Sequence, residues 1–167
     1  ARLALVALLA GGHLLLEDVP GVGKTTLARI VSRVIGGHDA RVQCTPDVGP
    51  DEVLGHMVQG ERPGEGRQFE AGPLFANAVV LDEINRATGR LQAALFEAME
   101  ERYVTVGGRR HPLPKPFFVV ATMNPYSGAD EHVRLAHGQR ERFSICTGIG
   151  YPSAAGERDL LRRFGGH

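Results

Sequence analysis

An apolar run leads into a glycine-rich turn and then into a segment with helical periodicity, and this order constrains the fold more than any other feature. The run is His13–Leu16, the turn continues through Gly21 and Gly23 to Lys24, and Leu27, Ile30, Val31 and Val34 follow on one helical face. Strand, loop and helix in this order is the context in which a Gly-Lys-Thr sequence indicates a phosphate-binding loop. The glycines let several backbone N–H groups point at one anion, and the helix N-terminus adds roughly half a positive charge. The sequence therefore predicts a site for a nucleoside triphosphate.

The residues of this loop have separate expected tasks. Lys24 supplies a full positive charge to the phosphates, and the Thr25 hydroxyl is suited to hold Mg²⁺. Asp18 stands where the usual pattern has its first glycine, and Asp is one of the few other residues that tolerate a positive φ. The alternative is a strand-to-helix turn that binds no ligand. The predicted nucleotide-binding residues are Pro20, Gly21, Val22, Gly23, Lys24, Thr25 and Thr26.

Composition narrows the class of protein. A length of 167 residues is that of one domain with a full core, and the formal net charge of zero gives no bulk attraction to nucleic acid or to an anionic membrane. No apolar run could span a bilayer and no signal-peptide pattern begins the chain, so we expect a cytoplasmic protein. Cys44 and Cys146 lie in apolar runs, which predicts core packing rather than a disulfide or a metal site. Helical patterns at 1–10 and at Ser153–Phe164 predict a piece truncated at both ends.

Strand and helix patterns alternate along the chain. Strands are expected at His13–Leu16, Arg41–Cys44, Ala78–Asp82, Phe117–Thr122 and Phe143–Ile149, all of them buried. The runs Val79–Leu81 and Phe117–Val120 are apolar without alternation, which is typical of parallel strands covered on both faces. Between the strands lie helical patterns, and in one of them a single helical face carries Leu91, Ala94, Leu95, Ala98 and Met99. The predicted fold class is α/β, a three-layer sandwich around a mostly parallel five-stranded sheet.

Two insertions interrupt this alternation. Met57–Phe69 contains a polar, glycine-containing turn between two short segments that resemble strands. Tyr103–His111 alternates in hydrophobicity and turns at Gly107-Gly108, which predicts a β-hairpin. Both insertions are expected to be β-hairpins added to the α/β core.

A second chemical signal lies at the end of the strand Ala78–Asp82. Asp82 at the strand tip is expected to hold the magnesium shell, and Glu83 to polarise a water for attack on the γ-phosphate. Asn124, after the next central strand, is expected to face the γ-phosphate, although Asn before Pro also begins ordinary turns. Arg142 suits stabilisation of transition-state charge, although an arginine in a charged run is usually solvated. The predicted catalytic residues are Lys24, Glu83, Asn124 and Arg142, with Thr25 and Asp82 at the metal.

With these motifs in place, the chain resembles the MoxR family of AAA+ ATPases over nearly all of its length. The matching segments are Gly11–Glu17, Pro20–Thr25, Thr45–Asp47, Gly72–Asn77, Leu81–Ala87, Glu97–Arg102, Val104–Gly108 and Phe117–Pro125. The resemblance implies that residues 1–167 form the large nucleotide-binding subdomain of a P-loop NTPase, without its C-terminal helical lid. It implies that the two hairpins are the helix-2 and pre-sensor-1 insertions, that Asn124 is sensor 1, and that Arg142 is the arginine finger.

The resemblance also implies partners and cofactors. These are ATP and Mg²⁺, a homo-oligomeric ring, commonly a hexamer, in which the finger acts in trans, and a von Willebrand factor A domain protein as a partner. The leading hypothesis is an ATPase that remodels or matures a partner protein. The alternative is an ATP-binding switch with little hydrolysis, because the residues that flank Arg142 depart from the family pattern. A small-molecule kinase lacks support, and the cluster Arg109, Arg110 and His111 is more typical of a solvated surface than of nucleic-acid binding.

Overall fold

A parallel sheet forms the centre of the protein. The computed structural model describes residues 2–17, 24–60, 62, 66–123, 135–148 and 158. In this part the central sheet has five strands in the order β2-β5-β8-β1-β9, and every neighbouring pair is parallel. The strands are β1 (Leu14–Glu17), β2 (Asp39–Gln43), β5 (Ala78–Asp82), β8 (Phe118–Met123) and β9 (Ile145–Thr147). The predicted α/β class and five-stranded sheet are confirmed.

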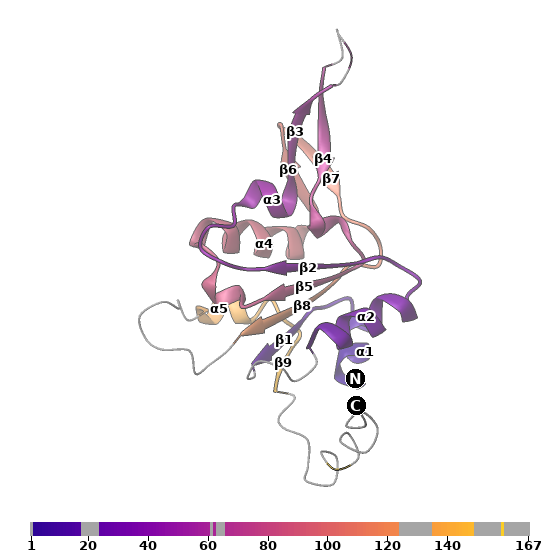
Figure 1. Cartoon of the computed structure of the whole chain (residues 1–167). Coiled ribbons are helices and arrows are strands. Elements are labelled where there is room, and N and C mark those ends of the chain that lie inside the picture. Colours follow the sequence, from indigo (N-terminus) through magenta and orange to yellow (C-terminus); the bar gives the residue numbers. More distant parts are fainter. Residues whose placement is uncertain are drawn as a thin grey trace.

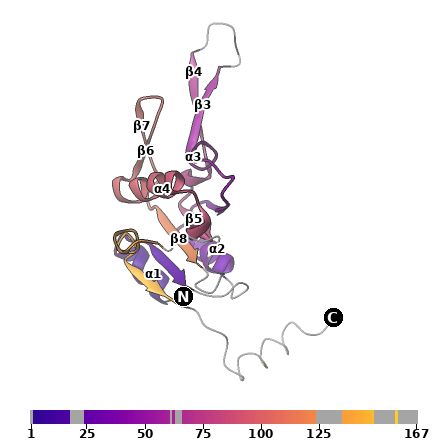
Figure 2. The ribbon, with the colours of Figure 1, turned by 90° about the vertical axis from the view of Figure 1, so that its left-hand side faces the viewer.

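Helices cover both faces of this sheet, as Figures 1 and 2 show. Helices α1 (Arg2–Leu9) and α2 (Lys24–Val34) lie over one face, where Val31 packs against Val80, Phe118 and Val120. Helices α3 (Pro50–Leu54) and α4 (Gly89–Glu101) lie over the other, where Leu91 and Leu95 join the larger core. The short elements are η1 (Pro73–Phe75), η2 (Ile84–Arg86) and α5 (His137–Arg140). Alternate strand residues face opposite layers, so both sides of β5 and β8 are apolar.

Burial separates the central strands from the edge strands. All residues of β5 and β8 are buried, as predicted for strands with helices on both faces. The prediction that β2 and β9 are buried strands is wrong, because both lie at the sheet edges and Val42 is the buried residue of β2. Cys44 is buried, but the expected core position of Cys146 is also wrong, because that residue is exposed on β9. An edge strand has a neighbour on one side only, so its side chains meet solvent.

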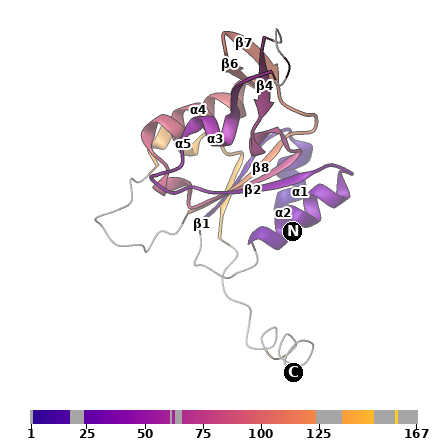
Figure 3. The same ribbon diagram turned by 45° about the horizontal axis from the view of Figure 1, so that its top comes forward.

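Two β-hairpins project beyond α3 and α4, and Figures 1 and 3 show them side by side at one end of the molecule. The first pairs β3 (Gly55–Gln59) with β4 (Arg67–Ala71), and the second pairs β6 (Tyr103–Val106) with β7 (Arg109–Pro112). Gly107 and Gly108 have φ of 59° and 74°, the left-handed pair that a two-residue hairpin turn requires. The rings of Phe69 and His111 stack with centroids 3.8 Å apart, so the hairpins contact each other. Both predicted insertions are confirmed.

A buried histidine joins the start of β1 to the sheet and to α4. His13 is 3% exposed, and its Nδ1 accepts from the Val119 N–H at 3.0 Å while Nε2 lies 3.3 Å from the Met99 carbonyl oxygen. Burial, and then the nearby charge of Arg102, lower the pKa of His13 from 6.5 to about 4. A neutral ring with Nε2–H satisfies both bonds, because Nδ1 then has a free lone pair. His13 is therefore a structural residue.

Several predicted segments fall outside the described residues. These include the phosphate loop from Asp18 to Gly23, Asn124, and the terminal helix expected at Ser153–Phe164. Of the helices that the structure describes, none has the length and apolar character needed to cross a membrane.

Candidate active site

The carboxyl ends of four parallel strands meet at one edge of the sheet. Glu17 pairs with Met123 in register, Leu81 with Ala121, and Gln43 with Asp82. Ligands of open α/β sheets bind outside the carboxyl ends of the strands, because the loops that follow them gather there. The predicted loop residues Pro20, Gly21, Val22 and Gly23 follow β1 in the chain but lie outside the described part, as does Asn124 after β8.

Helix α2 begins at Lys24, directly after the predicted loop, and its backbone supports the expected order of strand, loop and helix. Thr26 lies in its first turn and is exposed. Val31 of this helix packs on the same sheet face as Val80, and strand alternation places Asp82 on that face as well. The end of β5 therefore presents its carboxylate toward the layer that contains α2.

Asp82 is a buried carboxylate, 7% exposed, at the tip of β5. Its Oδ1 accepts a hydrogen bond from the Thr122 hydroxyl at 3.0 Å. Its Oδ2 accepts from Arg41 Nε at 2.6 Å, in an ion pair whose arginine side chain is 56% exposed. Both carboxylate oxygens are thus oriented, one by a neutral hydroxyl and one by a cation.

Glu83 has a left-handed backbone with φ 56° and ψ 50°, a conformation that costs a non-glycine residue roughly 1–2 kcal/mol. Its side-chain Oε2 accepts from Gln43 Nε2 at 3.1 Å and from Arg86 Nη1 at 3.0 Å. The carboxylate is partly exposed, so a water molecule can reach it. Strained residues of this kind are concentrated at functional sites.

Thr122 connects the two acids. Its Oγ1 donates to Asp82 and accepts from the Glu83 backbone N–H at 3.0 Å, and the residue is 1% exposed. Sequence reasoning did not assign Thr122, Arg41, Gln43 or Arg86 to the site. For Arg41 and Gln43 the sequence did contain a signal. They are two residues apart on a strand, so their side chains share one face of the sheet.

Cys44, which follows β2, has a buried thiol beside the two acids. The Cys44 N–H donates to the Asp82 carbonyl at 2.8 Å, and the residue is fully buried. Burial, followed by the charges of Asp82 and Glu83, raises the pKa of the Cys44 thiol to about 12. A thiol that stays protonated is a poor nucleophile and a poor metal ligand.

Arg142 follows α5 and its guanidinium forms an ion pair with Glu100 near the end of α4. Its side chain is 41% exposed. The neighbouring Arg140 pairs with Glu17 at 2.7 Å, and Phe143 contacts Phe96 edge-on with centroids 6.0 Å apart. The end of α5 is thus attached to β1 and the segment after it to α4, with Arg142 on the surface.

The acids fit a magnesium–nucleotide site. Mg²⁺ in such sites is bound by one or two protein oxygens together with substrate phosphates, and Asp82 offers one buried carboxylate at the expected place. In the described part of the chain, no group of three or more His, Cys, Asp and Glu side chains could hold a metal ion unaided. Any ion at Asp82 would therefore take its other ligands from nucleotide, water, or residues such as Thr25, whose side chain is not described.

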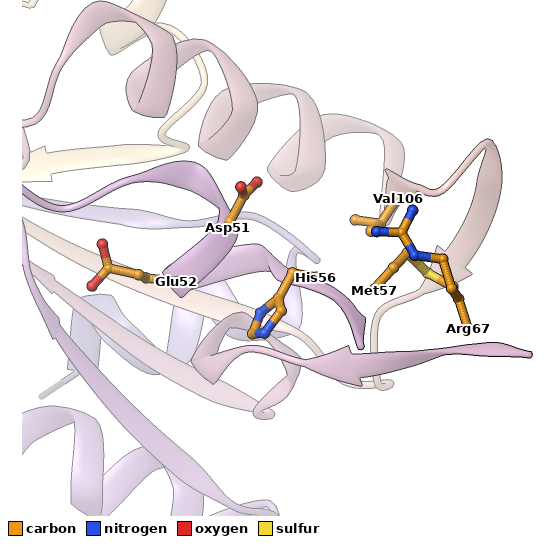
Figure 4. A pocket seen from close by; sticks show the side chains of 6 residues that line it. All are labelled: Asp51, Glu52, His56, Met57, Arg67 and Val106. Atoms are coloured by element: carbon orange, nitrogen blue, oxygen red, sulfur yellow. The ribbon is translucent and has the colours of Figure 1, made fainter. Parts of the chain in front are cut away.

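A separate hollow of about 490 Å³ lies where the hairpins leave the body. Figure 4 shows Asp51 and Glu52 of α3 at one end of it and Met57, Arg67 and Val106 at the other, with His56 between. Glu52 also accepts from the Gly49 N–H at 3.0 Å, which caps α3. The lining is mixed in charge, and it comes from both hairpins and the helix at their base.

Comparisons with known proteins agree with this architecture. The sequence profile of a family described as "ATPase family associated with various cellular activities (AAA)" matches residues 13–145. Chaperone MoxR1 of Mycobacterium tuberculosis is 45% identical over 163 residues, which cover 96% of this chain and 42% of that protein. Protein MoxR of Methylorubrum extorquens is 37% identical over 167 residues, covering 96% and 47%.

A solved structure gives the same result for the fold. A crystal structure of a Cytophaga hutchinsonii protein, described as a candidate ATPase, superposes with a TM-score of 0.84 at 34% identity and covers 99% of this chain and 49% of its own. The chain therefore spans about half the length of the relatives that it matches.

Proposed function

The chain belongs to the MoxR family of AAA ATPases, and from this premise we propose that it binds ATP with Mg²⁺ and hydrolyses it. The observation that carries the proposal is the pairing of Asp82 and Glu83 through Thr122 at the carboxyl edge of the sheet, beside the start of α2. A Lys and a Thr begin that helix, as a phosphate-binding loop requires.

Each residue has a distinct task in the proposed reaction. Lys24 and the loop Pro20–Thr26 bind the phosphates, and Thr25 with Asp82 holds Mg²⁺, which neutralises charge on the phosphate oxygens. Glu83 polarises the attacking water, and its partly exposed carboxylate is suited to that task. Asn124 orients the water or the γ-phosphate.

In the proposed function, a neighbouring subunit of a homo-oligomeric ring completes this site. We propose that Arg142 reaches the nucleotide of a neighbouring subunit, because its side chain is on the surface and 41% exposed. An arginine supplied in trans is worth about 10³–10⁵ in rate. At about 1.36 kcal/mol for each tenfold change, this is roughly 4–7 kcal/mol of the barrier. A hexamer is the form that the family resemblance suggests.

The biological role that we propose is remodelling or maturation of a partner protein in the cytoplasm. One relative is named a chaperone, which supports this reading. We propose that the contacting hairpins, with the hollow at their base, form the surface that docks the partner. A protein with a von Willebrand factor A domain is a candidate partner.

A specific observation favours a second function, that of a nucleotide-dependent switch with little turnover. Glu83 is engaged by Gln43 and Arg86, and Arg142 is engaged by Glu100, so both catalytic groups are occupied within the chain. If these contacts persist when ATP is bound, the protein changes shape without rapid hydrolysis.

The test is steady-state ATP hydrolysis as a function of protein concentration, with Glu83→Gln as the variant and Glu97→Gln as its control. Glu97 is an exposed glutamate of α4, so its substitution makes the same chemical change away from the site. We expect specific activity to rise with concentration and to fall by about 10²–10⁴ in Glu83→Gln, with nucleotide binding retained. Turnover in Glu83→Gln equal to that of Glu97→Gln would refute the assignment. Tight binding with near-zero turnover at every concentration would favour the switch.

A further inference from the structure

Arg41 forms an ion pair with Asp82, whose carboxylate the proposed function assigns to Mg²⁺. Its Nε donates to Asp82 Oδ2 at 2.6 Å, while the Thr122 hydroxyl takes Oδ1. The hydroxyl is neutral and can remain when a cation approaches. The guanidinium is always charged and cannot leave by losing a proton, so a metal at Oδ2 meets a fixed positive charge.

The position of Arg41 allows it to be displaced. It lies on β2, an edge strand, and in register it is opposite Val80 rather than Asp82, so its side chain reaches along the strands to the carboxylate. That side chain is 56% exposed, whereas the Asp82 side chain is 10% exposed. A guanidinium that leaves the pair moves into water, which hydrates it at little cost, and the buried carboxylate then needs another cation.

We propose that Arg41 is a competitor of Mg²⁺ for Asp82, and that it sets the Mg²⁺ concentration at which the protein binds nucleotide tightly. Without nucleotide, Arg41 neutralises the buried acid and keeps the end of β5 in place. With nucleotide, the phosphates and the carboxylate bind the divalent ion together, and Arg41 leaves the carboxylate. This inference rests on the proposed function, because it concerns the same site.

The opposite arrangement is a supporting role, in which Arg41 stays on Oδ2 and orients Asp82 toward the metal. The two roles predict opposite changes in the Mg²⁺ requirement when Arg41 is removed. Removing a competitor lowers the Mg²⁺ concentration needed for half-saturation, whereas removing a support raises it. Measurement of that concentration therefore decides between them without reference to turnover.

The experiment is a Mg²⁺ titration of the intact protein at a fixed concentration of a fluorescent ATP analogue, with and without Arg41→Gln. We expect the half-saturating Mg²⁺ concentration to fall about fivefold in Arg41→Gln, which corresponds to about 1 kcal/mol for a partly exposed ion pair. An unchanged or higher concentration would overturn the inference. Folding of the variant is checked from its thermal unfolding without Mg²⁺, and Arg41→Lys, which keeps the charge, should give an intermediate value.

Two controls separate the local contact from a general charge effect. Arg29→Gln removes the same charge from α2, where Arg29 pairs with Asp39 of the same strand β2 at 4.0 Å, and should not shift the titration. In an Asp82→Asn background, Arg41→Gln should also have no effect, because the competition needs the carboxylate. An equal shift in either control would refute the competition. A wild-type protein whose nucleotide binding ignores Mg²⁺ would overturn the proposed function as well, whereas a wild type that needs Mg²⁺ with no shift in Arg41→Gln would overturn this inference alone.

Discussion

The stability of the fold should depend on pH through His13, and replacement of His13 by Asn should remove most of that dependence. The folded chain holds the ring neutral, because Val119 donates to Nδ1 and burial lowers the pKa from 6.5 to about 4. The unfolded chain takes up this proton near pH 6.5. The contribution of the neutral His13 ring to the free energy of unfolding is therefore fully present above about pH 6.5 and is lost as the pH falls toward about 4.

The size of the effect follows from the two pKa values. Between about pH 7.5 and about pH 5 the unfolded state gains most of a proton that the folded state refuses, which removes about 2 kcal/mol. Asn at this position keeps an acceptor for the Val119 N–H but loses the contact with the Met99 carbonyl and the edge-on contact with Phe117. The variant should be about 1–3 kcal/mol less stable near neutral pH, with a flatter pH profile.

The assay is urea unfolding followed by circular dichroism at several pH values, since the chain has no tryptophan. His56→Asn is the matched control, because His56 is exposed on the first hairpin and the same substitution there leaves the core intact. The difference in unfolding free energy between wild type and His13→Asn should shrink by about 2 kcal/mol from about pH 7.5 to about pH 5. A difference that stays constant with pH would refute the buried neutral histidine.

Two further substitutions test the local geometry. Gly55→Ala should lower the free energy of unfolding by more than about 3 kcal/mol, because φ is 99° and the added Cβ would lie 2.3 Å from the Glu70 carbonyl oxygen and 2.7 Å from the Gly72 nitrogen. Gly89→Ala, where the added Cβ would meet nothing within 4 Å beyond its chain neighbours and its own helix backbone, should change it by less than about 1 kcal/mol. Similar urea midpoints for the two variants would contradict the crowding at Gly55. Thr122→Val should cost about 1–3 kcal/mol because it leaves Asp82 Oδ1 and the Glu83 N–H without their partner. Thr122→Ser keeps both bonds and should therefore be more stable than Thr122→Val. If the two variants unfold at the same temperature in a thermal melt, this bridging role is refuted.

The central strands and the hairpins could be predicted from the sequence because their signals are local. Continuous apolar runs predicted that β5 and β8 are covered on both faces, and alternation with Gly107-Gly108 predicted the second hairpin. Which strands lie at the edges depends on the order in the sheet, and no local pattern encodes that order. Cys146 was therefore assigned to the core, although β9 places it at the surface.

The two acids of the site could be predicted from the sequence, whereas the residues that hydrogen-bond to them could not. Asp82 and Glu83 were found because they follow an apolar strand, and the structure brings both to the carboxyl edge of the sheet. Thr122 lies 40 residues from Asp82 in sequence, and Arg41 lies 41 residues from it, so only the pairing of β2, β5 and β8 reveals their contacts. The predicted role of Arg142 in trans stays a prediction.

The ion pairs at this edge explain why one architecture supports both an ATPase and a switch. Away from this edge, at the amino ends of the strands, Arg142 pairs with Glu100 of α4. At the edge itself, Glu17, Asp82 and Glu83 pair with Arg140, Arg41 and Arg86 in turn. A magnesium–nucleotide complex placed here has to exchange partners with these arginines, because its phosphates attract them and its cation attracts the carboxylates. Hydrolysis then depends on whether Glu83 and Arg142 leave their partners within the lifetime of bound ATP. That rate, rather than the identity of the residues, separates the two functions, and for this reason turnover at high protein concentration is the measurement that decides between them.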